Sequence, residues 1–341
     1  MHSRRRGPGW LRILVLAALV LAPLRAGAEE IKIGVLKSVS TGPIFLAVDK
    51  GYFAAEGLEP KLVTFVSAQP VAVAVASHDI DIAATAFTGG LFGLAGQGAI
   101  RIVAGYAKNV PGFKFDALVV SNHAWENGVR SYKDFAGHAY GVSQIGAPPH
   151  YELALIAEKY GFDLKSVRIV PLQSLPNVAS ALVGGQVDAS SLVGAVAFPL
   201  IDRGEIKLLG WTGDEVPYQL GAVFTSAKTA AANPDLIAKF LHAYRKGVHE
   251  YYDAFTGRDG RRADGPGADA VAEVIAKYTG LSPAQVKQGA VYFDREARID
   301  EADVMHQIAW FLKEGLIKAP VDPAVFFDKR FIVPLPKPQA Q

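Results

Sequence analysis

Cysteine is absent from the 341-residue sequence, and neither sign of charge is in marked excess. Without cysteine there can be no disulfide framework, no thiol nucleophile, no cysteine-ligated metal and no lipid attached to a cysteine. The 35 Lys and Arg residues stand against 33 Asp and Glu, and the basic residues form no stripe of the kind that a phosphate backbone requires. We therefore expect no nucleic-acid partner.

Long hydrophobic runs are also scarce, since no segment beyond the N-terminal region offers about twenty uninterrupted apolar residues. Near the N-terminus, a basic triplet at residues 4–6, an apolar run at 13–24 and small residues at 26–28 follow one another. These three parts predict a secretory signal peptide over residues 1–28 and a mature chain free in a periplasm. The alternative, a retained membrane anchor, is disfavoured because the run is short for a bilayer.

Hydrophobic residues make up half of the chain, so it can bury a large core and is expected to form about two domains. An internal duplication supports that expectation. Residues 31–84 and 138–191 share one order of landmarks: a strand-like run, a Gly and Pro break, a helical run, a glycine turn, a second strand, a helix of small residues opened by proline, and an Asp-containing strand. Asp81 and Asp188, the matching acidic residues, are 107 positions apart.

Strands that alternate with helical runs form mainly parallel sheets, whose ligand-facing loops lie at the carboxyl ends of the strands. The fold is therefore predicted to be α/β with two lobes, each a mixed, mainly parallel sheet flanked by helices, and a ligand cleft between them. Strand-like runs at 117–120 and 206–209 bracket the second copy, and we interpret them as hinge crossings between the lobes. Lobe I would then comprise residues 29–115 and 212–341, and lobe II residues 116–211.

The C-terminal part of the chain is predicted to be helical. Proline opens a long helix at residues 234–255, and three further helical stretches follow at 268–278, 283–290 and 301–315. We expect these helices to pack on lobe I. The glycine-rich, charged segment at 257–267 predicts an exposed loop, with a docking patch as the alternative.

Four motifs follow one another as in a known family: DKGYFAAEGL at residues 49–58, the Asp-containing strand at 80–83, SYKDFAG at 131–137 and GGQVDA at 184–189. With them the chain resembles the periplasmic substrate-binding proteins of ABC importers for nitrate, sulfonates, taurine and thiamine precursors. The resemblance runs from about residue 31 to residue 332. It implies a two-lobed periplasmic binding protein fold, a small-molecule ligand and an ABC permease as the partner in the inner membrane. We expect a monomer without cofactor or metal.

One position departs from the family pattern. Six residues past Asp188, many relatives have an acidic residue and a proline, which in some of them hold an amine, whereas this chain has Gly194 and Ala195. The departure argues against a cationic ligand. Together with two predicted helix N-termini, several hydroxyls and nearby aromatic residues, it favours a small organic anion, a sulfonate or carboxylate with an apolar or aromatic body.

Eleven residues at predicted strand ends, helix starts or crossings are candidates for contact with the ligand. Hydroxyls and backbone N–H groups at helix N-termini suit an anionic group, and aromatic side chains can cover an apolar body. The candidates are Ser38, Ser40, Thr41, Gln69, Phe87, Thr88, Ser143, His150, Asn177, Ser191 and Trp211.

A structural role is the alternative for several of these residues. Thr41 can instead cap its helix, Phe87 can pack in the core, and Trp211 can fill the hinge. His150 can be a surface or hydrogen-bonded histidine. The glycines within residues 89–98 predict a closely packed helix and no phosphate loop, because no Gly-Lys-Ser/Thr sequence follows them.

An enzyme is the rival class of function, since some relatives of the fold take part in pyrimidine synthesis for thiamine or in menaquinone formation. The chain has no Gly-x-Ser-x-Gly, no His-Glu-x-x-His and no cysteine, and we expect no catalytic residues. Asp81 and Asp188 are interpreted as structural residues whose carboxylates accept hydrogen bonds from nearby backbone N–H groups. A ligand-sensing module is a third possibility, which the sequence does not separate from a carrier.

Overall fold

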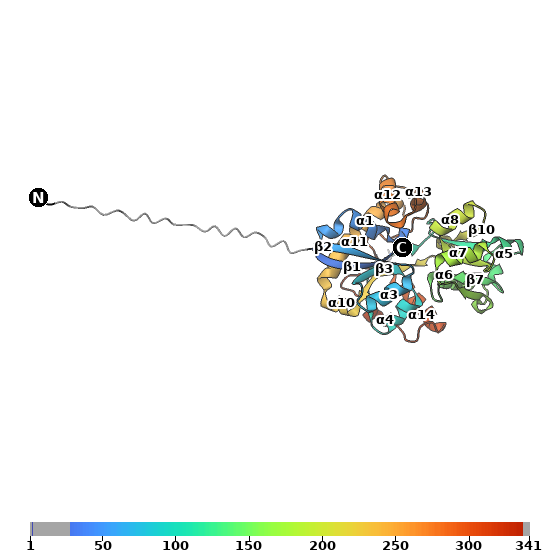
Figure 1. The fold of residues 1–341 in the computed structure, drawn as a ribbon. Helices are drawn as coiled ribbons and strands as arrows, with labels where there is room; N and C mark the ends of the chain where they lie inside the picture. Colours follow the sequence, from blue (N-terminus) through green and yellow to red (C-terminus); the bar gives the residue numbers. More distant parts are fainter. Residues whose placement is uncertain (1, 3–27, 337–341) are drawn as a thin grey trace.

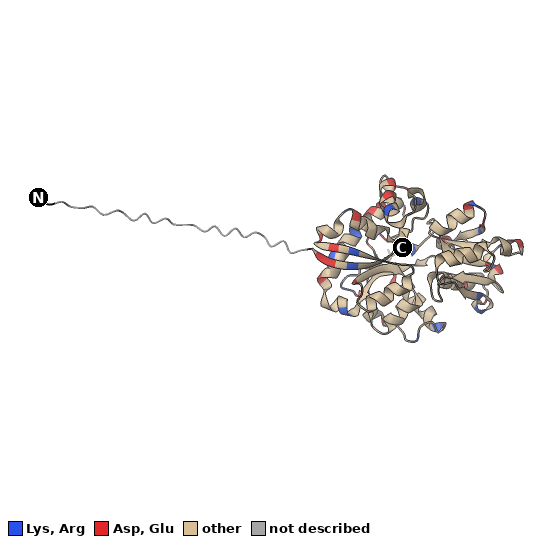
Figure 2. Ribbon diagram, viewed as in Figure 1, with Lys and Arg blue, Asp and Glu red and all other residues tan. Residues whose placement is uncertain are grey.

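The computed structural model describes residue 2 and residues 28–336. The predicted signal peptide therefore lies outside the described residues, apart from its positions 2 and 28. Figure 1 shows two lobes side by side, each with a sheet between helices. Acidic and basic residues are intermingled on the outer parts of both lobes (Figure 2). None of the helices within residues 28–336 has the length and hydrophobicity of a membrane-spanning segment.

Lobe I is built on a five-stranded sheet with the order β2-β1-β3-β12-β4. Its strands are β1 (Glu29–Leu36), β2 (Leu58–Phe65), β3 (Ile82–Ala86), β4 (Ile100–Gly105) and β12 (Gly221–Ser226). β1 pairs in parallel with β2 and β3, whereas β12 runs antiparallel to β3 and β4. The connecting helices are α1 (Gly42–Asp49), α2 (Tyr52–Ala55), α3 (Ala68–Ala76) and α4 (Gly89–Gly96).

Lobe II repeats this plan with the strand order β10-β6-β9-β7-β8. Its strands are β6 (Asp116–Ser121), β7 (Ala139–Val142), β8 (Arg168–Pro171), β9 (Ala189–Val193) and β10 (Ile206–Trp211). β7 pairs in parallel with β8 and β9, and β6 runs antiparallel to β9 and β10. Its helices are α5 (Asn122–Glu126), α6 (Pro148–Tyr160), α7 (Leu175–Val183) and α8 (Gly194–Asp202). The predicted two-lobed α/β fold is confirmed.

The duplication extends to individual hydrogen bonds. Asp81 Oδ2 accepts a hydrogen bond of 2.8 Å from Lys32 N, and Asp188 Oδ2 accepts one of 2.8 Å from Ala139 N. Lys32 and Ala139 are themselves 107 positions apart. Each aspartate thus ties the start of the third strand of its copy to the first strand, and the structural role predicted for both is confirmed. Because the aspartates lie in the turn, β3 and β9 begin after them and later than predicted.

The crossings between the lobes differ from the prediction. The runs at 117–120 and 206–209 lie inside β6 and β10, neighbouring strands of the lobe II sheet. Both runs are strand-like, and local sequence does not show whether such a run pairs inside a lobe or crosses between the lobes. The chain crosses instead through β5 (Lys108–Asn109) and β11 (Tyr218–Gln219), which form a separate two-stranded antiparallel sheet.

The C-terminal helices pack on lobe I as predicted. They are α10 (Ala227–Ala232), α11 (Pro234–Phe255), α12 (Ala268–Thr279), α13 (Pro283–Gln288), α14 (Glu301–Lys313) and α15 (Pro323–Phe326). In α11, Ile237, Phe240 and Tyr244 recur at helical spacing and are buried in the core of lobe I. The segment 257–267 is mostly exposed, as predicted.

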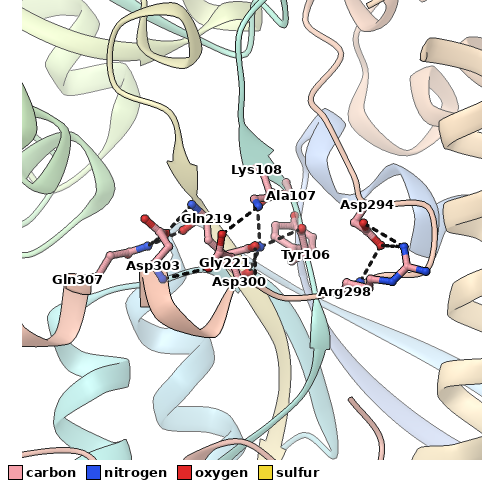
Figure 3. A network of polar contacts seen from close by, with 10 residues as sticks. All are labelled: Tyr106, Ala107, Lys108, Gln219, Gly221, Asp294, Arg298, Asp300, Asp303 and Gln307. Carbon is pink, nitrogen blue, oxygen red and sulfur yellow. Dashed lines mark hydrogen bonds and ion pairs between the residues drawn. The ribbon is translucent and has the colours of Figure 1, made fainter. Parts of the chain in front are cut away.

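Helix α14 braces the hinge through the buried side chain of Gln219 (Figure 3). Gln219 Nε2 donates to the carbonyl oxygens of Tyr106 at 3.2 Å, Ala107 at 3.3 Å and Gly221 at 2.9 Å. Asp303 Oδ2 accepts from Gln219 N at 2.8 Å, and Gln307 Nε2 donates to Gln219 O at 2.7 Å. One side chain therefore links both crossings, and the backbone beside it is held by α14.

Replacing this residue by Gln219→Leu is expected to destabilise the protein by about 2 to 3 kcal/mol, because buried carbonyl groups lose their donor. Chemical denaturation monitored by circular dichroism measures the change. Gln288→Leu, at an exposed position, is the matched control and should shift the free energy of unfolding by less than about 0.5 kcal/mol. Equal effects of the two variants would contradict the role assigned to Gln219.

Candidate functional site

A cavity of about 680 Å³ lies between the lobes and is lined by residues of both. Its walls include residues 36–40, 64–69, 85, 86 and 88 from lobe I, and residues 143–149 and 191–196 contain further wall positions in lobe II. These segments follow β1, β2, β3, β7 and β9, so the cavity lies at the carboxyl ends of the strands. In α/β sheets this is where loops are free to bind ligands.

Several cavity hydroxyls start the helices that surround the site. Thr88 Oγ1 accepts from Leu91 N at 3.1 Å and caps α4, and Ser174 Oγ caps α7 through Asn177 N at 3.3 Å. The N-termini of α3 and α8 have no side-chain cap, although they too border the cavity. Their free backbone N–H groups are available to an anionic group of a ligand.

The structure brings six of the eleven predicted residues to the wall of this cavity. They are Ser38, Ser40, Gln69, Thr88, Ser143 and Ser191. They come from both lobes, so a ligand that touched all of them would hold the lobes together. Their contact with a ligand stays a prediction.

Three further predicted residues, Thr41, Phe87 and Trp211, are outside the cavity wall and have structural partners. Thr41 Oγ1 donates to Leu36 O at 2.8 Å and thereby fixes the loop after β1. Phe87 stacks on Phe92 with 5.1 Å between the ring centroids. Trp211 packs against the ring of Phe198, at 5.2 Å. Phe87 therefore packs in the core, which was its structural alternative, whereas Thr41 makes no side-chain cap to its helix and Trp211 packs within lobe II and not in the hinge.

His150 and Asn177 also lie outside the cavity wall. The His150 ring meets the Trp310 ring edge-on at 5.3 Å, and its Nδ1 accepts from Gly146 N at 3.2 Å. Burial lowers the pKa of His150 to about 4, so the ring is neutral at neutral pH and able to accept this bond. Asn177 is exposed and donates to Leu172 O at 2.8 Å.

Two acidic residues that sequence reasoning missed, Asp116 and Glu152, line the cavity and are buried. Asp116 opens β6, and Glu152 lies in the second turn of α6. The sequence does contain one sign of this site: Glu152 lies four residues before Ile156 and so shares the apolar stripe of its helix. A carboxylate on a buried stripe requires polar partners, and this requirement marks a candidate site.

Burial raises the pKa of Asp116 well above its usual range, and the charge of Glu152 raises it further. Burial also raises the pKa of Glu152, although the neighbouring hydroxyl groups of Ser191, Tyr218 and Thr212 oppose the change. No Lys, Arg or His nitrogen in the described part of the chain lies within 4.0 Å of either carboxyl. The pair therefore holds a proton more readily than exposed carboxylates do.

The variant Glu152→Gln tests this electrostatic account in the ligand-free protein. Because folding raises the pKa of Glu152, its stabilising contribution is fully present below the unfolded pKa, near 4.5, and is lost as pH rises through the folded pKa. The thermal midpoint of the variant should therefore gain on that of the wild type as pH rises from about 5 to about 8. Glu158→Gln, at an exposed position on the same helix, is the matched control. A constant difference for Glu152→Gln would contradict the account.

The lobes also touch directly beside the cavity. Gly89 N, at the start of α4, donates to Gly146 O at 3.0 Å across the cleft. Gly146 has a φ of +78°, and a Cβ there would lie 3.3 Å from Gly89 N. Tyr151 of α6 packs against Trp310 and Phe311 of α14, with ring centroids 5.3 and 6.2 Å apart. The structure thus shows the lobes in contact.

A second cavity of about 450 Å³ borders this contact and shares Gln69 with the larger one. It lies against Gly89, Gly90 and Gly93 of α4 and the segment 316–319. Close packing of the glycine-rich helix is confirmed at Gly90, where a Cβ would come within 2.9 Å of Gln69, but a Cβ at Gly93 would meet nothing within 4 Å. The larger cavity, at the strand ends, is the candidate site.

Two lobes that enclose a cavity at the carboxyl ends of their strands and are joined by a two-stranded hinge define a periplasmic binding protein fold. The family model described as NMT1/THI5 like matches residues 39–254, which is more than half of the chain. The chain therefore belongs to the NMT1/THI5-like family. No curated protein sequence matches it.

Solved structures of solute-binding proteins have the same fold. The periplasmic aliphatic sulphonate binding protein SsuA from Escherichia coli is 15% identical, with a TM-score of 0.69, and the match covers 92% of this chain and 96% of that one. The alkanesulfonate-binding protein SsuA from Xanthomonas axonopodis pv. citri, bound to MOPS, is 18% identical, with a TM-score of 0.67, and the match covers 89% of this chain and 100% of that one. The nitrate-binding protein NrtA from Synechocystis PCC 6803 is 11% identical, with a TM-score of 0.68, and the match covers 89% of this chain and 87% of that one. At these identities the likeness establishes the fold alone.

Proposed function

We propose that the protein is an extracytoplasmic solute-binding protein that captures a small organic molecule and delivers it to an ABC importer. The observation that carries the proposal is the cavity between the lobes, with walls from both of them and two crossings that permit opening. A cavity of this kind releases its ligand only when the lobes separate. Delivery then requires a permease that recognises the closed form.

The size of the cavity bears on the class of ligand. A volume of about 680 Å³ is within the range of roughly 300 to 1,000 Å³ that holds drug-sized molecules, and it greatly exceeds the need of nitrate. The wall contains many apolar side chains, among them Phe65, Phe115 and Leu281. These features support a ligand with an apolar or aromatic body.

The predicted sulfonate or carboxylate group requires a place away from Asp116 and Glu152, whose charge would repel it. The uncapped N-termini of α3 and α8 offer such a place, with the hydroxyls of Ser38 and Ser40 on the loop after β1. We therefore assign any anionic group of the ligand to that part of the cavity.

A thermal-shift screen of residues 29–341 tests the proposed function. The panel contains nitrate, alkanesulfonates, aromatic carboxylates, taurine and thiamine-pyrimidine precursors. A ligand at 100 times its dissociation constant adds about 2.7 kcal/mol to the stability and visibly raises the unfolding midpoint. One class of organic hit, bound once per chain and recovered unchanged, supports a carrier. A hit that is recovered chemically altered would instead support an enzyme.

A soluble ligand sensor would bind in the same way. Reconstitution with the permease encoded beside it, where one exists, separates the two roles. A carrier should stimulate ATP hydrolysis by that transporter when ligand is present, whereas a sensor should leave the rate unchanged.

A further inference from the structure

We propose that Asp116 and Glu152 hold a nitrogen-bearing end of the ligand, a group with at least two N–H donors such as a primary ammonium or an amidinium. The inference rests on the proposed function, because it concerns what the same cavity selects. It departs from the purely anionic ligand that the sequence predicted, and it assigns specificity to residues other than the pair at Gly194 and Ala195.

The two carboxyls are positioned by both crossings between the lobes. Asn109 Nδ2, on β5, donates to Asp116 Oδ2 at 2.8 Å and lies 3.5 Å from Glu152 Oε1. Tyr218 Oη, on β11, donates to Glu152 Oε1 at 2.7 Å, and Thr212 Oγ1 lies 3.4 Å from Glu152 Oε2. Because every one of these partners is buried, the pair forms a prearranged acceptor site at the hinge side of the cavity.

The protein's own donors do not saturate this pair. An ionised carboxylate offers about four acceptor positions, yet Asp116 accepts a bond from Asn109 and otherwise shares a hydrogen bond with the Glu152 carboxyl itself. With no cationic side chain within 4.0 Å, any negative charge that the pair carries is also uncompensated in this part of the chain. Buried charge without a partner is costly, and a cation with several N–H groups would supply both the charge and the donors.

Two buried hydroxyls provide an independent indication of a ligand. Ser191 Oγ and Thr85 Oγ1 have no hydrogen bond of ordinary geometry, although both residues line the cavity and are 2% and 1% exposed. Ser191 lies on β9 two residues before Val193, the residue opposite Asp116, so it shares a sheet face with that carboxyl. Thr85 reaches the cavity from lobe I. Buried polar atoms are normally paired, and a bound N–H or O–H group would complete these two.

A metal ion fits this site less well than an organic cation. Within the described residues, no group of three His, Cys, Asp or Glu side chains is arranged to hold a metal. The neighbouring wall residues Phe115, Val193 and Leu220 are apolar and offer no further ligands. They suit a hydrocarbon body attached to the nitrogen.

Binding a cation at the pair should release a proton. In the free protein the raised pKa values favour a proton shared by the pair, and an incoming ammonium or amidinium favours the fully ionised form. That proton passes to the buffer, while the ligand keeps its own. The other titratable groups facing the pair are Tyr140 and Tyr218, whose pKa values burial raises well above 10, so they keep their protons at neutral pH.

Isothermal titration calorimetry with ring-matched probes tests the inference. The probes are benzylamine and benzamidine as cations, benzoate and benzenesulfonate as anions, and benzyl alcohol as a neutral control, each at up to about 10 mM to detect millimolar dissociation constants. We expect the cations to bind, with release of up to about one proton, measured from buffers of different ionisation enthalpy. Glu152→Gln and Asp116→Asn should each weaken cation binding by about 30-fold.

Glu158→Gln, on the exposed face of α6, is the matched control and should leave binding unchanged. If the anions or the alcohol bind and the cations do not, the inference is overturned and the proposed function stands. Cation binding that both variants leave unchanged, or that releases no proton, also overturns it. If no probe of any class binds, the inference is overturned, and the thermal-shift screen alone decides the proposed function. Thermal unfolding confirms that each variant is folded. If only one of Glu152→Gln and Asp116→Asn folds, that variant alone is enough for the test.

Discussion

The variant Ala195→Trp should lose at least about 100-fold in affinity for any ligand of the cavity, which corresponds to about 2.7 kcal/mol. Ala195 lies in the first turn of α8 and lines the cavity, and its backbone nitrogen is only 3.8 Å from the position that a Cβ on Gly289 of lobe I would occupy. An indole there would take up ligand volume and also hinder approach of the lobes. The added side chain enters an existing cavity, so the cost in stability should be small.

The matched control is Ala232→Trp, an exposed position at the end of α10. It should retain the affinity of the wild type in the same titration. If Ala195→Trp bound the ligand as tightly as this control does, the ligand site would have to lie elsewhere on the molecule.

Gly146→Val should weaken ligand binding by about 10-fold to 100-fold by disfavouring the closed arrangement. The side chain would meet Gly89 N and the ring of Phe311, both about 3.3 Å from the new Cβ, only when the lobes are in contact. Small-angle X-ray scattering with saturating ligand should give a larger radius of gyration for the variant than for the wild type. A larger radius of gyration would show that the loss of affinity comes from disfavoured contact between the lobes.

The left-handed backbone at Gly146 carries its own cost, which a second variant isolates. Gly161 has a φ of +75°, ends α6 and has nothing within 4 Å of its Cβ position. Gly161→Val should therefore lower stability through backbone strain and leave affinity unchanged. Equal losses of affinity in both variants would contradict the role of the contact between Gly89 and Gly146.

Much of the fold could be predicted from the sequence because its signals are local. Strand and helix patterns repeat at a constant spacing, and Asp81 and Asp188 mark the same turn in both copies. The crossings could not be found in this way. The runs at 117–120 and 206–209 are strand-like, and only their pairing with each other, and that of 117–120 with β9, places them in the lobe II sheet. The actual crossings, Lys108–Asn109 and Tyr218–Gln219, are only two residues long and give no strand pattern.

The candidate site was predictable only in part, for a related physical reason. Loops at strand ends must approach the cleft in this fold, so residues such as Ser38 and Ser143 reached the cavity wall. Whether a side chain on such a loop turns toward the cleft depends on tertiary contacts, and Phe87 and Asn177 found other partners. Asp116 and Glu152 come from the start of strand β6 and from a helix interior, where local patterns do not indicate a ligand.

Closure of the two lobes around one ligand is the central claim, and a distance measurement tests it most directly. Because the chain has no cysteine, a double variant Ala54→Cys and Lys133→Cys accepts two fluorophores at exposed positions, one on each lobe. Titration with the compound that gives the largest thermal shift should change the energy-transfer efficiency and saturate at one ligand per chain. The added Ala195→Trp change should abolish that response. An efficiency that stays constant while the compound binds would contradict the account.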